Sequence, residues 1–348
     1  MSNQQKITCK ACFAFGEKDV RVAQRELEYS DREVLVKVEC GGICGSDIHY
    51  YQHGRAGMSV LKHPMVVGHE FVGVVTKAPT GSALRVGQRV AVNPSQPCNA
   101  CEYCLSGQQN LCSSMRFMGS AQFNPHVNGG FSEYVTATEA QCIPYDKVTP
   151  QVMAFAEPTA VAIHAVNVAG PLVGKKVLVI GAGPIGCLIM AAARTAGATE
   201  IVASDVSPRC LELAMAMGAS ATFNPLENGS SELYQANRGY FDVVFEASGS
   251  PAAIASTVAL TRPAGKVVQV GMGAASVEYP VMPMLVKEIS WVGSFRFIDE
   301  FATAVAWLQD GRINPLPLLS GEYAPEAIED ALIAAADKTL SCKVQIKF

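Results

Sequence analysis

The sequence predicts an α/β chain in which an antiparallel, barrel-like part is interrupted by a doubly wound parallel sheet. Up to about residue 155, apolar and polar side chains alternate in short runs separated by glycine and proline, which is typical of antiparallel strands. Between about 175 and 295, continuous apolar runs alternate with helix-patterned stretches, which predicts a parallel sheet buried on both faces. Beyond residue 299 the first texture returns, so we expect that segment to fold back onto the first part.

Each part can be divided into elements by its periodicity. The alternating runs of the first part predict four strands: Glu33–Cys40, Glu70–Thr76, Arg89–Asn93 and Phe131–Val135. The central part predicts the strands Val177–Gly181, Ile201–Asp205, Phe241–Ala247 and Lys266–Gly271, and the helices Pro184–Ala196, Pro208–Met217 and Ala252–Leu260. After Asp299 we expect a helix to Gly311, a turn through Pro315 and Pro317, a helix over Pro325–Ala336 and a strand over Cys342–Phe348.

Length and composition exclude several classes of protein. The chain has 348 residues, enough for two domains with large cores. Hydrophobic residues make up 49 % and charged residues 17 %, which is typical of a globular protein. The net charge of −4 creates no field that attracts a polyanion, so we expect no nucleic-acid partner.

The sequence contains no segment that we interpret as a signal peptide or a membrane span. Residues 1–10 are polar and lack the apolar stretch of a secretion signal. The apolar run Val177–Ala193 contains three glycines and a proline, which favours a strand that turns into a buried helix. We therefore expect a cytoplasmic protein with no membrane partner.

Four of the twelve cysteines are clustered, which indicates reduced thiols and metal ligands rather than disulfides. They stand as Cys98-x2-Cys101-x2-Cys104-x7-Cys112, so that one polar loop could surround one ion with four sulfurs. This spacing is typical of a structural zinc site with every position filled. It also fits an iron–sulfur loop, but a second candidate zinc site elsewhere in the chain favours zinc.

A glycine motif follows the first apolar strand of the central part and opens a helix. It reads Gly181-Ala-Gly183-Pro184-Ile185-Gly186. The first glycine permits a tight turn, the second lets the backbone approach a pyrophosphate, and the third allows the helix to pack closely on the strand. The helix N-terminus supplies N–H groups to the anion, so this context predicts a dinucleotide site.

Two residues, one at the end of the next strand and one shortly after it, bear on which dinucleotide binds. Asp205 ends that strand and is placed to bind a ribose 2′-hydroxyl, which favours NAD over NADP. Arg209 follows four residues later and could reach a 2′-phosphate, so NADP remains possible. The alternative for Asp205 is a helix N-cap, because Pro208 begins a helix.

A second group of possible metal ligands is more dispersed. Cys44 follows a Gly-Gly turn, and His69-Glu70 begin a strand pattern. A thiolate and an imidazole suit a catalytic zinc, and Glu70 or Glu157 could supply oxygen donors. Asp47 could orient the imidazole of His69 from behind. From spacing alone this site is only suggestive, since a lone cysteine or histidine is more often a core residue.

The stretch Gly68-His-Glu-Phe-Val-Gly73 resembles the zinc signature of the medium-chain dehydrogenases/reductases. The cysteine quartet and the glycine motif fall in that family's order, and the resemblance covers essentially the whole chain. Glu157 stands where the alcohol dehydrogenases carry a cysteine ligand, so the chain looks like the polyol (sorbitol) dehydrogenase group. The resemblance implies a GroES-like β-barrel catalytic domain over 1–157 and 298–348, interrupted by a Rossmann domain over 158–297. It also implies an active cleft between them, and a homodimer or homotetramer.

The resemblance assigns roles to the second group of ligands. Cys44, His69 and Glu157 would bind a catalytic zinc, which makes two zinc ions per chain with the cysteine loop. Glu70 would bind the zinc only transiently, or it would contact the ligands without binding the zinc itself. Glu157 would bind directly or through a water molecule.

Further roles concern the proton and the cofactor. Ser46 would take the proton of the substrate hydroxyl, and the cofactor ribose and His49 would pass it to solvent. An aqueous histidine has a pKa of about 6.5, which suits such a relay near neutral pH. The alternative for His49 is an ordinary surface residue. Lys343 stands where the family places a cation that can approach the cofactor phosphates.

The implied reaction is oxidation of a secondary alcohol of a sugar acid or polyol to a ketone, with hydride transfer to NAD(P). Several long stretches resemble sugar-acid dehydrogenases of this group, among them 115–120, 125–130, 293–297 and 314–320. A sugar acid needs a cation to meet its carboxylate. Our substrate-site candidates are Arg116, Arg296, Tyr50 and Phe117, with Arg55 as a further possibility; each could instead serve structure alone.

Two other interpretations remain open. One is a dehydrogenase of neutral polyols such as sorbitol, xylitol or galactitol. The other is a non-catalytic zinc- and NAD-binding protein, against which the presence of Cys44, Ser46 and His69 argues. For the oligomer, we expect an apolar strand such as Val281–Val292 to pair sheets across a two-fold axis.

Overall fold

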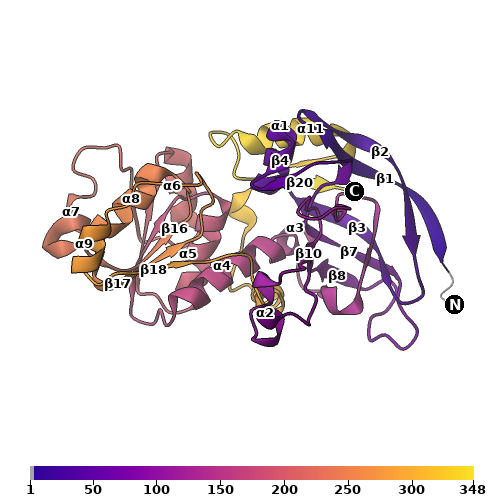
Figure 1. Ribbon diagram of the computed structural model, residues 1–348, viewed down its shortest axis with the longest axis horizontal. Coiled ribbons are helices and arrows are strands. Elements are labelled where there is room, and N and C mark those ends of the chain that lie inside the picture. The colour runs from indigo at the N-terminus through magenta and orange to yellow at the C-terminus, as the bar shows by residue number, and fades with distance from the viewer. Residues whose placement is uncertain (1–3) are drawn as a thin grey trace. The chain divides into compact units, whose positions relative to one another are not determined.

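The computed structural model describes residues 4–348, which divide into two compact units (Figure 1). Unit 1 comprises Met1–Glu157, Phe301–Gly311 and Leu319–Phe348, and unit 2 comprises Pro158–Glu300 and Arg312–Leu318. The expected division used the same first boundary, but it had one return to unit 1, at residue 298. In the structure the chain crosses back to unit 2 for residues 312–318.

Unit 1 is built on a seven-stranded sheet in the order β12-β8-β7-β3-β20-β19, with β11 also paired to β3. All pairs are antiparallel except β19 with β20. The strand β20 comes from the C-terminus and pairs with β3 near the N-terminus, which confirms that the tail folds back. The strands are β3 Val34–Gly42, β7 Glu70–Lys77, β8 Arg89–Val92, β11 Tyr134–Ala137, β12 Cys142–Pro144, β19 Leu319–Tyr323 and β20 Lys343–Lys347.

A long hairpin that the sequence reading did not single out forms a second layer of unit 1. β1 (Gln5–Gly16) pairs with β2 (Asp19–Tyr29), and β6 (Met65–Val66) pairs with β1. Helices α1 (Gly45–His53) and α11 (Ile328–Ala336) contact each other, and residues of both join a core cluster around Phe131. Smaller elements are β4 Arg55–Ala56, β5 Ser59–Val60, β9 Ser95–Gln96, β10 Arg116–Phe117, α2 Glu102–Leu105, α3 Pro150–Met153 and α10 Glu300–Gln309.

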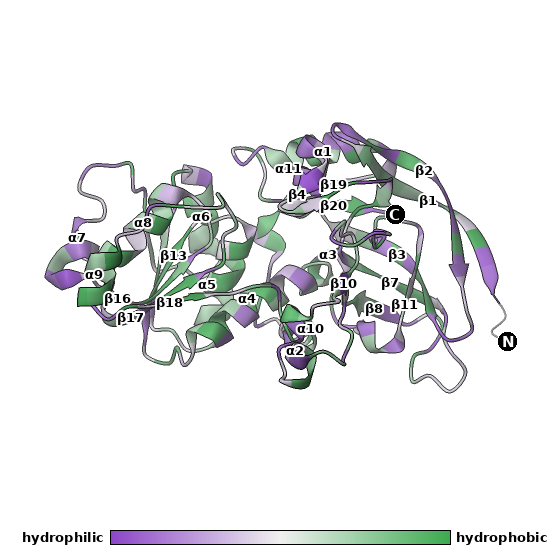
Figure 2. Cartoon of the chain, in the orientation of Figure 1, coloured by the Kyte–Doolittle hydropathy of each residue, from purple (hydrophilic) through white to green (hydrophobic). Residues whose placement is uncertain are grey.

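Unit 2 contains the predicted parallel sheet, in the order β15-β14-β13-β16-β17-β18. Figure 2 shows its strands as predominantly hydrophobic, as expected for strands covered on both faces. The strands are β13 Lys176–Ile180, β14 Glu200–Ser204, β15 Ala221–Phe223, β16 Phe241–Glu246, β17 Thr261–Gln269 and β18 Ser290–Gly293. The helices are α4 Ala156–Ala169, α5 Pro184–Thr195, α6 Pro208–Ala216, α7 Glu232–Gln235, α8 Pro251–Leu260 and α9 Val281–Val286.

The order of the strands places a switch point in the middle of this sheet. From β13 the chain moves outward to β14 and β15, and then returns to β16 on the other side of β13. Because parallel crossovers are right-handed, the connections on the two sides of β13 run over opposite faces. Ligands of such sheets bind at the carboxyl ends of the strands that flank the switch point, here β13 and β16.

Three expected elements differ from the structure. The strand expected over Lys266–Gly271 is β17, which already begins at Thr261. The segment Val281–Val292 was expected to be one strand, but it forms the short helix α9 followed by β18. Pro283 lies inside this run, where it cannot donate a ladder hydrogen bond but is tolerated in a first helical turn. The strand expected from Phe131 begins at Tyr134, and Phe131 is instead a buried loop side chain.

One helical stretch, Pro150–Ala169, is long and apolar enough to cross a membrane by length and composition alone. However, 83 % of its most apolar window is buried inside the structure, as in the core helix of a globular protein. The run Val177–Ala193 forms β13 and most of α5, which confirms the predicted strand, turn and helix.

The three motif glycines are required for different reasons. Gly181 has a φ of +91°, in the region that favours glycine, and a side chain there would strike Ser248. A side chain at Gly186 would collide with the carbonyl oxygen of Gly181. Gly183 has an ordinary φ of −70° and no atom within 4 Å of the space that a Cβ would occupy. Folding therefore requires glycine at 181 and 186, but not at 183.

This difference predicts opposite behaviour for two alanine variants. We expect Gly186→Ala to lower the free energy of unfolding by about 1–3 kcal/mol or more, because overpacking forces α5 away from β13. Gly183→Ala should leave unfolding unchanged but weaken NADH binding, because its methyl group lies where the pyrophosphate approaches. Urea denaturation and NADH fluorescence titration measure the two effects. Equal unfolding midpoints for both variants would contradict the assignment.

Candidate functional site

The cysteine loop brings its four sulfurs together as predicted. The Sγ atoms of Cys98, Cys101, Cys104 and Cys112 all lie within 4.8 Å of one another, and those of Cys98 and Cys104 are 3.9 Å apart. Four sulfurs at about 2.3 Å from one zinc would be separated by about 3.8 Å. This spacing leaves room for one ion and not for a cluster of several irons, so it favours zinc over the iron–sulfur alternative.

Backbone N–H groups of the loop are directed at these sulfurs. The N–H of Cys98 donates to Sγ of Cys112, and the N–H of Cys101 donates to Sγ of Cys98. Backbone N–H groups of Cys104 and Ser113 lower the pKa of the Cys101 thiol to about 6, whereas burial raises the pKa of Cys104 to about 12. A loop that stabilises thiolates in this way fits a bound cation.

The second cluster combines ligands from two segments of unit 1. Cys44 precedes α1, and His69 precedes Glu70, the first residue of β7. One ligand atom from each of these three residues lies within 4.8 Å of the others. The Nδ1 atom of His69 is buried with no hydrogen-bond partner in the described part of the chain. The other ring nitrogen hydrogen-bonds the thiol of Cys44, and an imidazole beside a thiol and a carboxylate is a donor set that fits a metal site.

Negative charge surrounds the imidazole of His69. Burial lowers its pKa, but the Cys44 thiolate, by charge and by hydrogen bond, and the carboxylates of Asp47 and Glu157 outweigh burial and raise it to about 10. Glu157, buried in the first turn of α4, thus lies near this cluster, although the group within 4.8 Å contains Glu70 in its place. The cluster therefore attracts positive charge, which a divalent cation would supply.

Asp47 is fully buried, and the structure gives it a different role from the expected one. Its Oδ2 accepts the N–H of Cys44 at 2.9 Å, and its Oδ1 accepts the N–H of Gly68 at 3.0 Å. We expected the carboxylate to orient the ring of His69, but the ring's Nδ1 has no hydrogen-bond partner. Asp47 instead joins the two backbone segments that carry Cys44 and His69.

Lys343 also differs from expectation. It lies on β20 with a side chain only 4 % exposed, and its ammonium contacts both carboxylate oxygens of Glu70, at 2.8 and 2.6 Å. It donates a third hydrogen bond to the carbonyl of Ile43 at 3.0 Å. With all three protons used, Lys343 neutralises Glu70 and is not directed at cofactor phosphates. Sequence reasoning missed this pair, because 273 residues separate its members.

Helix α1 carries the two proposed relay residues, Ser46 and His49, together with Tyr50. Ser46 is half-buried and His49 is exposed, and their spacing of three places them on one helix face. Burial, His53 and Lys338 lower the pKa of His49, so it does not keep the aqueous value that we expected. Tyr50 is 2 % exposed, and its hydroxyl accepts the N–H of Ala121 at 2.9 Å. This favours packing over substrate contact for Tyr50.

The two-residue strand β10 points its side chains in opposite directions. The ring of Phe117 lies 5.5 Å from that of His69 and packs against Cys104 and Cys112. Arg116, the neighbouring residue, is exposed and lines a pocket that contains no candidate ligand of the second cluster. Because strand neighbours alternate, a residue that places Phe117 beside His69 turns Arg116 away from it.

The other two candidate arginines occupy different surroundings. Arg296 belongs to unit 2 and has a φ of +54°, and its guanidinium lies 4.9 Å above the ring of Phe295. Arg55 begins β4 and is exposed. Neither has a contact that assigns it to substrate.

At the glycine motif, both carboxylate oxygens of Asp205 accept backbone N–H groups. Oδ2 binds the N–H of Ala182 at 2.7 Å, inside the motif, and Oδ1 binds that of Ser207 at 2.9 Å. The N-cap of α6 is Ser207, so the alternative of Asp205 as the cap is wrong. Arg209 follows in α6, and its Nε is buried without a hydrogen-bond partner in the described chain.

A further carboxylate at the switch point escaped the sequence reading. Glu246 ends β16 and is fully buried. Its oxygens accept the N–H groups of Ser248 and Gly249 and the side-chain amide of Gln269 at 2.6 Å. It therefore fixes the loops that follow β16 and β17, next to Gly181. The position at the carboxyl end of a predicted strand was the signal that could have identified it.

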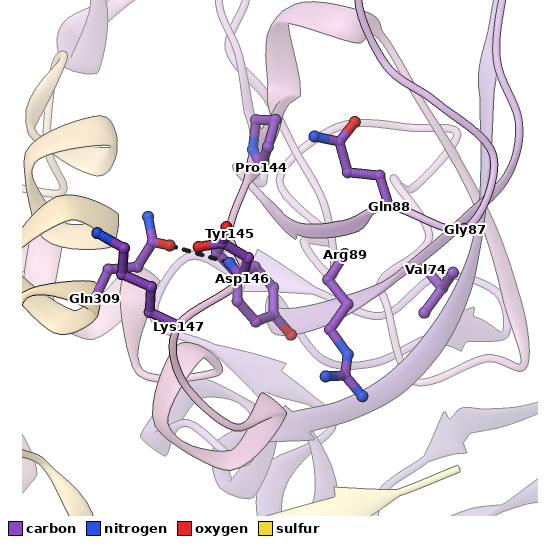
Figure 3. A pocket seen from close by; sticks show the side chains of 9 residues that line it. All are labelled: Val74, Gly87, Gln88, Arg89, Pro144, Tyr145, Asp146, Lys147 and Gln309. Atoms are coloured by element: carbon purple, nitrogen blue, oxygen red, sulfur yellow. Dashed lines mark hydrogen bonds between the residues drawn. The ribbon is translucent and has the colours of Figure 1, made fainter.

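Figure 3 shows a separate hollow of unit 1, with a volume of about 640 Å³. Its lining includes Arg89, Tyr145 and Lys147, and Gln309 accepts the N–H of Asp146 there. Arg89 is paired with Glu39. None of the predicted site residues lines this hollow.

Comparison with known proteins gives the same result for both units. The model of the alcohol dehydrogenase GroES-like domain matches residues 30–147, and that of the zinc-binding dehydrogenases matches residues 184–310. The chain is 50 % identical to the L-idonate 5-dehydrogenase (NAD(P)(+)) of Escherichia coli K12, over 99 % of this chain and 100 % of that protein. The crystal structure of L-idonate 5-dehydrogenase from that species superposes with a TM-score of 0.97 at the same coverage.

More distant relatives share the same architecture. A probable D-xylulose reductase A of Neosartorya fischeri is 36 % identical over 90 % of both chains. An Escherichia coli alcohol dehydrogenase (rspB), solved in complex with NADH, is 29 % identical with a TM-score of 0.89, over 98 % of this chain and 99 % of that one. The chain therefore belongs to the zinc-dependent medium-chain dehydrogenases/reductases of the polyol dehydrogenase group.

Proposed function

We propose that this protein oxidises the C5 hydroxyl of L-idonate to a ketone, giving 5-keto-D-gluconate, with hydride transfer to NAD(P). The observation that carries this proposal is 50 % identity over the full length to a dehydrogenase named for that substrate. The reaction removes a hydride from the carbinol carbon and a proton from its oxygen. The alternative is a neutral polyol as substrate, which the similarity to xylulose reductases supports more weakly.

The residues of unit 1 divide the work of the proposed reaction. Cys44 and His69, with Glu157 or Glu70, would hold the catalytic zinc, which would supply Lewis acidity to lower the pKa of the substrate hydroxyl. Ser46 accepts the hydroxyl proton, and His49, on the same helix face, passes it to solvent. The lowered pKa of His49 keeps its imidazole neutral near pH 7, in the form that can accept a proton.

For recognition of the substrate carboxylate we propose Arg296, or else Arg55, on the chemistry of the guanidinium group alone. A buried carboxylate needs a cation, and arginine can bind both of its oxygens. Arg116 was a candidate on the same footing as Arg296, but it lines a pocket that contains none of Cys44, His69 and Glu70, whereas its neighbour Phe117 faces His69. We therefore propose that Arg116 does not contact the substrate, whereas Phe117 forms an apolar wall beside the metal.

For the cofactor we propose a preference for NAD. Asp205 is fixed beside the glycine motif by the N–H groups of Ala182 and Ser207, where its charge repels a 2′-phosphate. Arg209 provides the opposing influence, since its unpartnered Nε would gain from a phosphate. NADP is therefore a weaker substrate and not an excluded one.

We also propose a cytoplasmic homodimer or homotetramer. None of the twelve cysteines, all of which lie within residues 4–348, forms a disulfide, which suits a reducing compartment. Strand β18 is the edge of the parallel sheet, and the neighbouring helix α9 exposes Val281, Met282, Leu285 and Val286. An unpaired edge beside an exposed apolar helix favours pairing with a second copy.

Metal analysis tests both clusters together. We expect two zinc ions per chain in the purified protein, and about one in Cys44→Ala, because the thiolate is the softest donor of the second cluster. Cys9→Ala is the matched control, since Cys9 is buried away from both clusters, and should retain two. Inductively coupled plasma mass spectrometry gives the count. One zinc per wild-type chain would show that one of the assignments is wrong.

A substrate panel tests the proposed reaction. We expect kcat/KM to be highest for L-idonate with NAD and lower with NADP, and rates on sorbitol, xylitol and galactitol to be lower still. Arg296→Ala should reduce kcat/KM for L-idonate about ten- to hundredfold with little change for polyols, because a charge-assisted hydrogen bond is lost. Arg116→Ala should change neither. Absorbance of the reduced nicotinamide measures each rate.

The outcomes of the panel separate the alternatives. Turnover of sorbitol without turnover of L-idonate would replace the sugar acid by a neutral polyol. Absence of turnover with every substrate, in protein that carries two zinc ions, would favour the non-catalytic alternative. A selective loss of L-idonate activity in Arg116→Ala would return that residue to the substrate site.

Light scattering of the purified protein tests the oligomer. We expect two or four copies at micromolar concentration, and we expect Leu285→Asp with Val286→Asp to shift the mass toward one copy, because charges cannot be buried in an apolar interface. A monomeric wild-type protein would contradict the proposed pairing.

A further inference from the structure

A second, smaller pocket in unit 1 contains two arginines and lies apart from the metal clusters. Its volume is about 280 Å³, near the lower limit of small-molecule sites. Strands β2, β9, β10 and β11 contribute to its walls, together with the loop 126–129. Arg25 enters from β2 and Arg116 from β10. None of Cys44, His69 and Glu70 lines it.

Arg25 is a cation whose guanidinium forms no hydrogen bond or ion pair within residues 4–348. Its Nη1 atom is buried and has no hydrogen-bond partner in the described part of the chain. No ion pair or hydrogen bond of its side chain is found among those residues, and burial lowers its pKa. Enclosing part of a guanidinium without an acceptor costs free energy, since its five N–H groups all seek partners. Such a group indicates that a partner is missing.

Two titratable groups of the pocket besides the arginines, Glu33 and His126, already have hydrogen-bond partners. Glu33 accepts the N–H and the hydroxyl of Ser30 through a single oxygen, Oε2. Both ring nitrogens of His126 are bonded, Nδ1 to the carbonyl of Phe123 and Nε2 to the N–H of Lys62, and its pKa is lowered, so this ring is neutral. Two guanidinium groups and one carboxylate leave a net positive charge, and Arg116 remains available to a ligand.

We propose that this pocket binds a small oxyanion, the carboxylate or phosphate of a metabolite, between Arg25 and Arg116. Planar guanidinium groups bind two oxygens of such an anion at once, and two of them suit a group with a full negative charge. The pocket is distinct from the metal clusters and from the glycine motif, so it constitutes an additional site.

Hydrogen bonds connect the wall of this pocket to the backbone segment that carries His69, a residue of the second metal cluster. Asn128 accepts the N–H of Val66 at 2.9 Å, and the N–H of Gly129 binds the carbonyl of Val66 at 2.7 Å. His126 holds Lys62 in the same way. The segment 62–68 runs directly into His69. An anion that fixes the wall therefore stabilises the segment that carries this ligand, and it should raise the melting temperature.

The test is titration of the zinc-loaded protein, saturated with NAD so that its pyrophosphate site is filled. Inorganic phosphate and succinate are the two probes, and sodium chloride at equal ionic strength is the salt control. Isothermal titration calorimetry gives the affinity, and differential scanning fluorimetry gives the melting temperature. The variants are Arg25→Met, Arg116→Met and Glu33→Gln. Arg21→Met is the matched control, because Arg21 lies on β2 but pairs with Asp19 outside the pocket.

We expect wild-type and Arg21→Met to bind at least one probe with equal affinity. Arg25→Met and Arg116→Met should each weaken binding about ten- to hundredfold, because each removes a charge-assisted pair. Glu33→Gln should tighten it, because the one opposing charge is lost while an acceptor for Ser30 is kept. Which probe binds distinguishes a phosphate from a carboxylate ligand.

Two results would overturn the proposal. One is the absence of binding to wild-type protein by both probes. The other is an affinity that is unchanged in Arg116→Met, a variant of an exposed residue that is expected to fold even if Arg25→Met does not. In that case the arginines of this pocket serve the structure alone.

Discussion

The carboxylate of Asp47 is the interaction on which the site depends. It is fully buried, and its two oxygens bind the N–H of Cys44 and the N–H of Gly68. These two segments are separate in sequence, one entering α1 and the other entering β7. The ladder between β3 and β7 pairs Gly42 with Glu70, and Asp47 extends this connection to the residues beyond the ladder. A charge-assisted pair of hydrogen bonds in a dry environment fixes both at once. These hydrogen bonds place the thiol of Cys44 and the ring of His69 next to each other.

The negative charge around Cys44 and His69 is only partly balanced by the described residues. Cys44, Glu70 and Glu157 bring negative charge to a buried volume, where Lys343 is bonded to both oxygens of Glu70 and the raised pKa of His69 favours a protonated imidazole. A buried ion pair contributes little net stability once desolvation is counted, but removing one partner leaves an uncompensated charge. Lys343 therefore allows Glu70 to remain beside the cluster, and the negative charge of Cys44 and Glu157 favours a further cation, which can be a proton on His69 or a divalent metal ion. The same argument explains why the pKa of His69 is raised despite its burial.

Most of the fold could be predicted from the sequence because its signals are local. The strands of unit 2 are continuous apolar runs, and β13, β14 and β16 begin and end within a residue of the predicted bounds. The cysteine loop is equally local, so its ligands could be named from spacing. The exceptions depend on contacts that periodicity does not encode. Val281–Val292 has the composition of a strand, but Pro283 and the local helix-forming residues divide it into α9 and β18.

The site was predicted less completely than the fold. The pair of Lys343 with Glu70 joins positions 273 residues apart, and only the placement of β20 against β3 brings them together. Arg116 and Phe117 were both assigned to substrate, but adjacent residues of a strand face opposite sides, and the two-residue strand β10 was not visible in the sequence. Tyr50 was read as a possible ligand of the substrate, and burial against Met65 and Ala121 engages its hydroxyl with the backbone instead. Glu246 was missed because its role arises only where two loops meet.

Phe117 gives the two metal clusters a common neighbour. One part of its ring environment is formed by Cys104 and Cys112, and on another side lies the imidazole of His69, 5.5 Å between ring centres. The cysteine loop thus packs against a residue that also neighbours the second metal cluster. Oxidation of the loop thiols would remove the packing of Phe117 against Cys104 and Cys112. A shift of Phe117 would then change the surroundings of His69 in the catalytic cluster. Damage by peroxide at the loop should therefore be felt as lost turnover before the barrel itself unfolds.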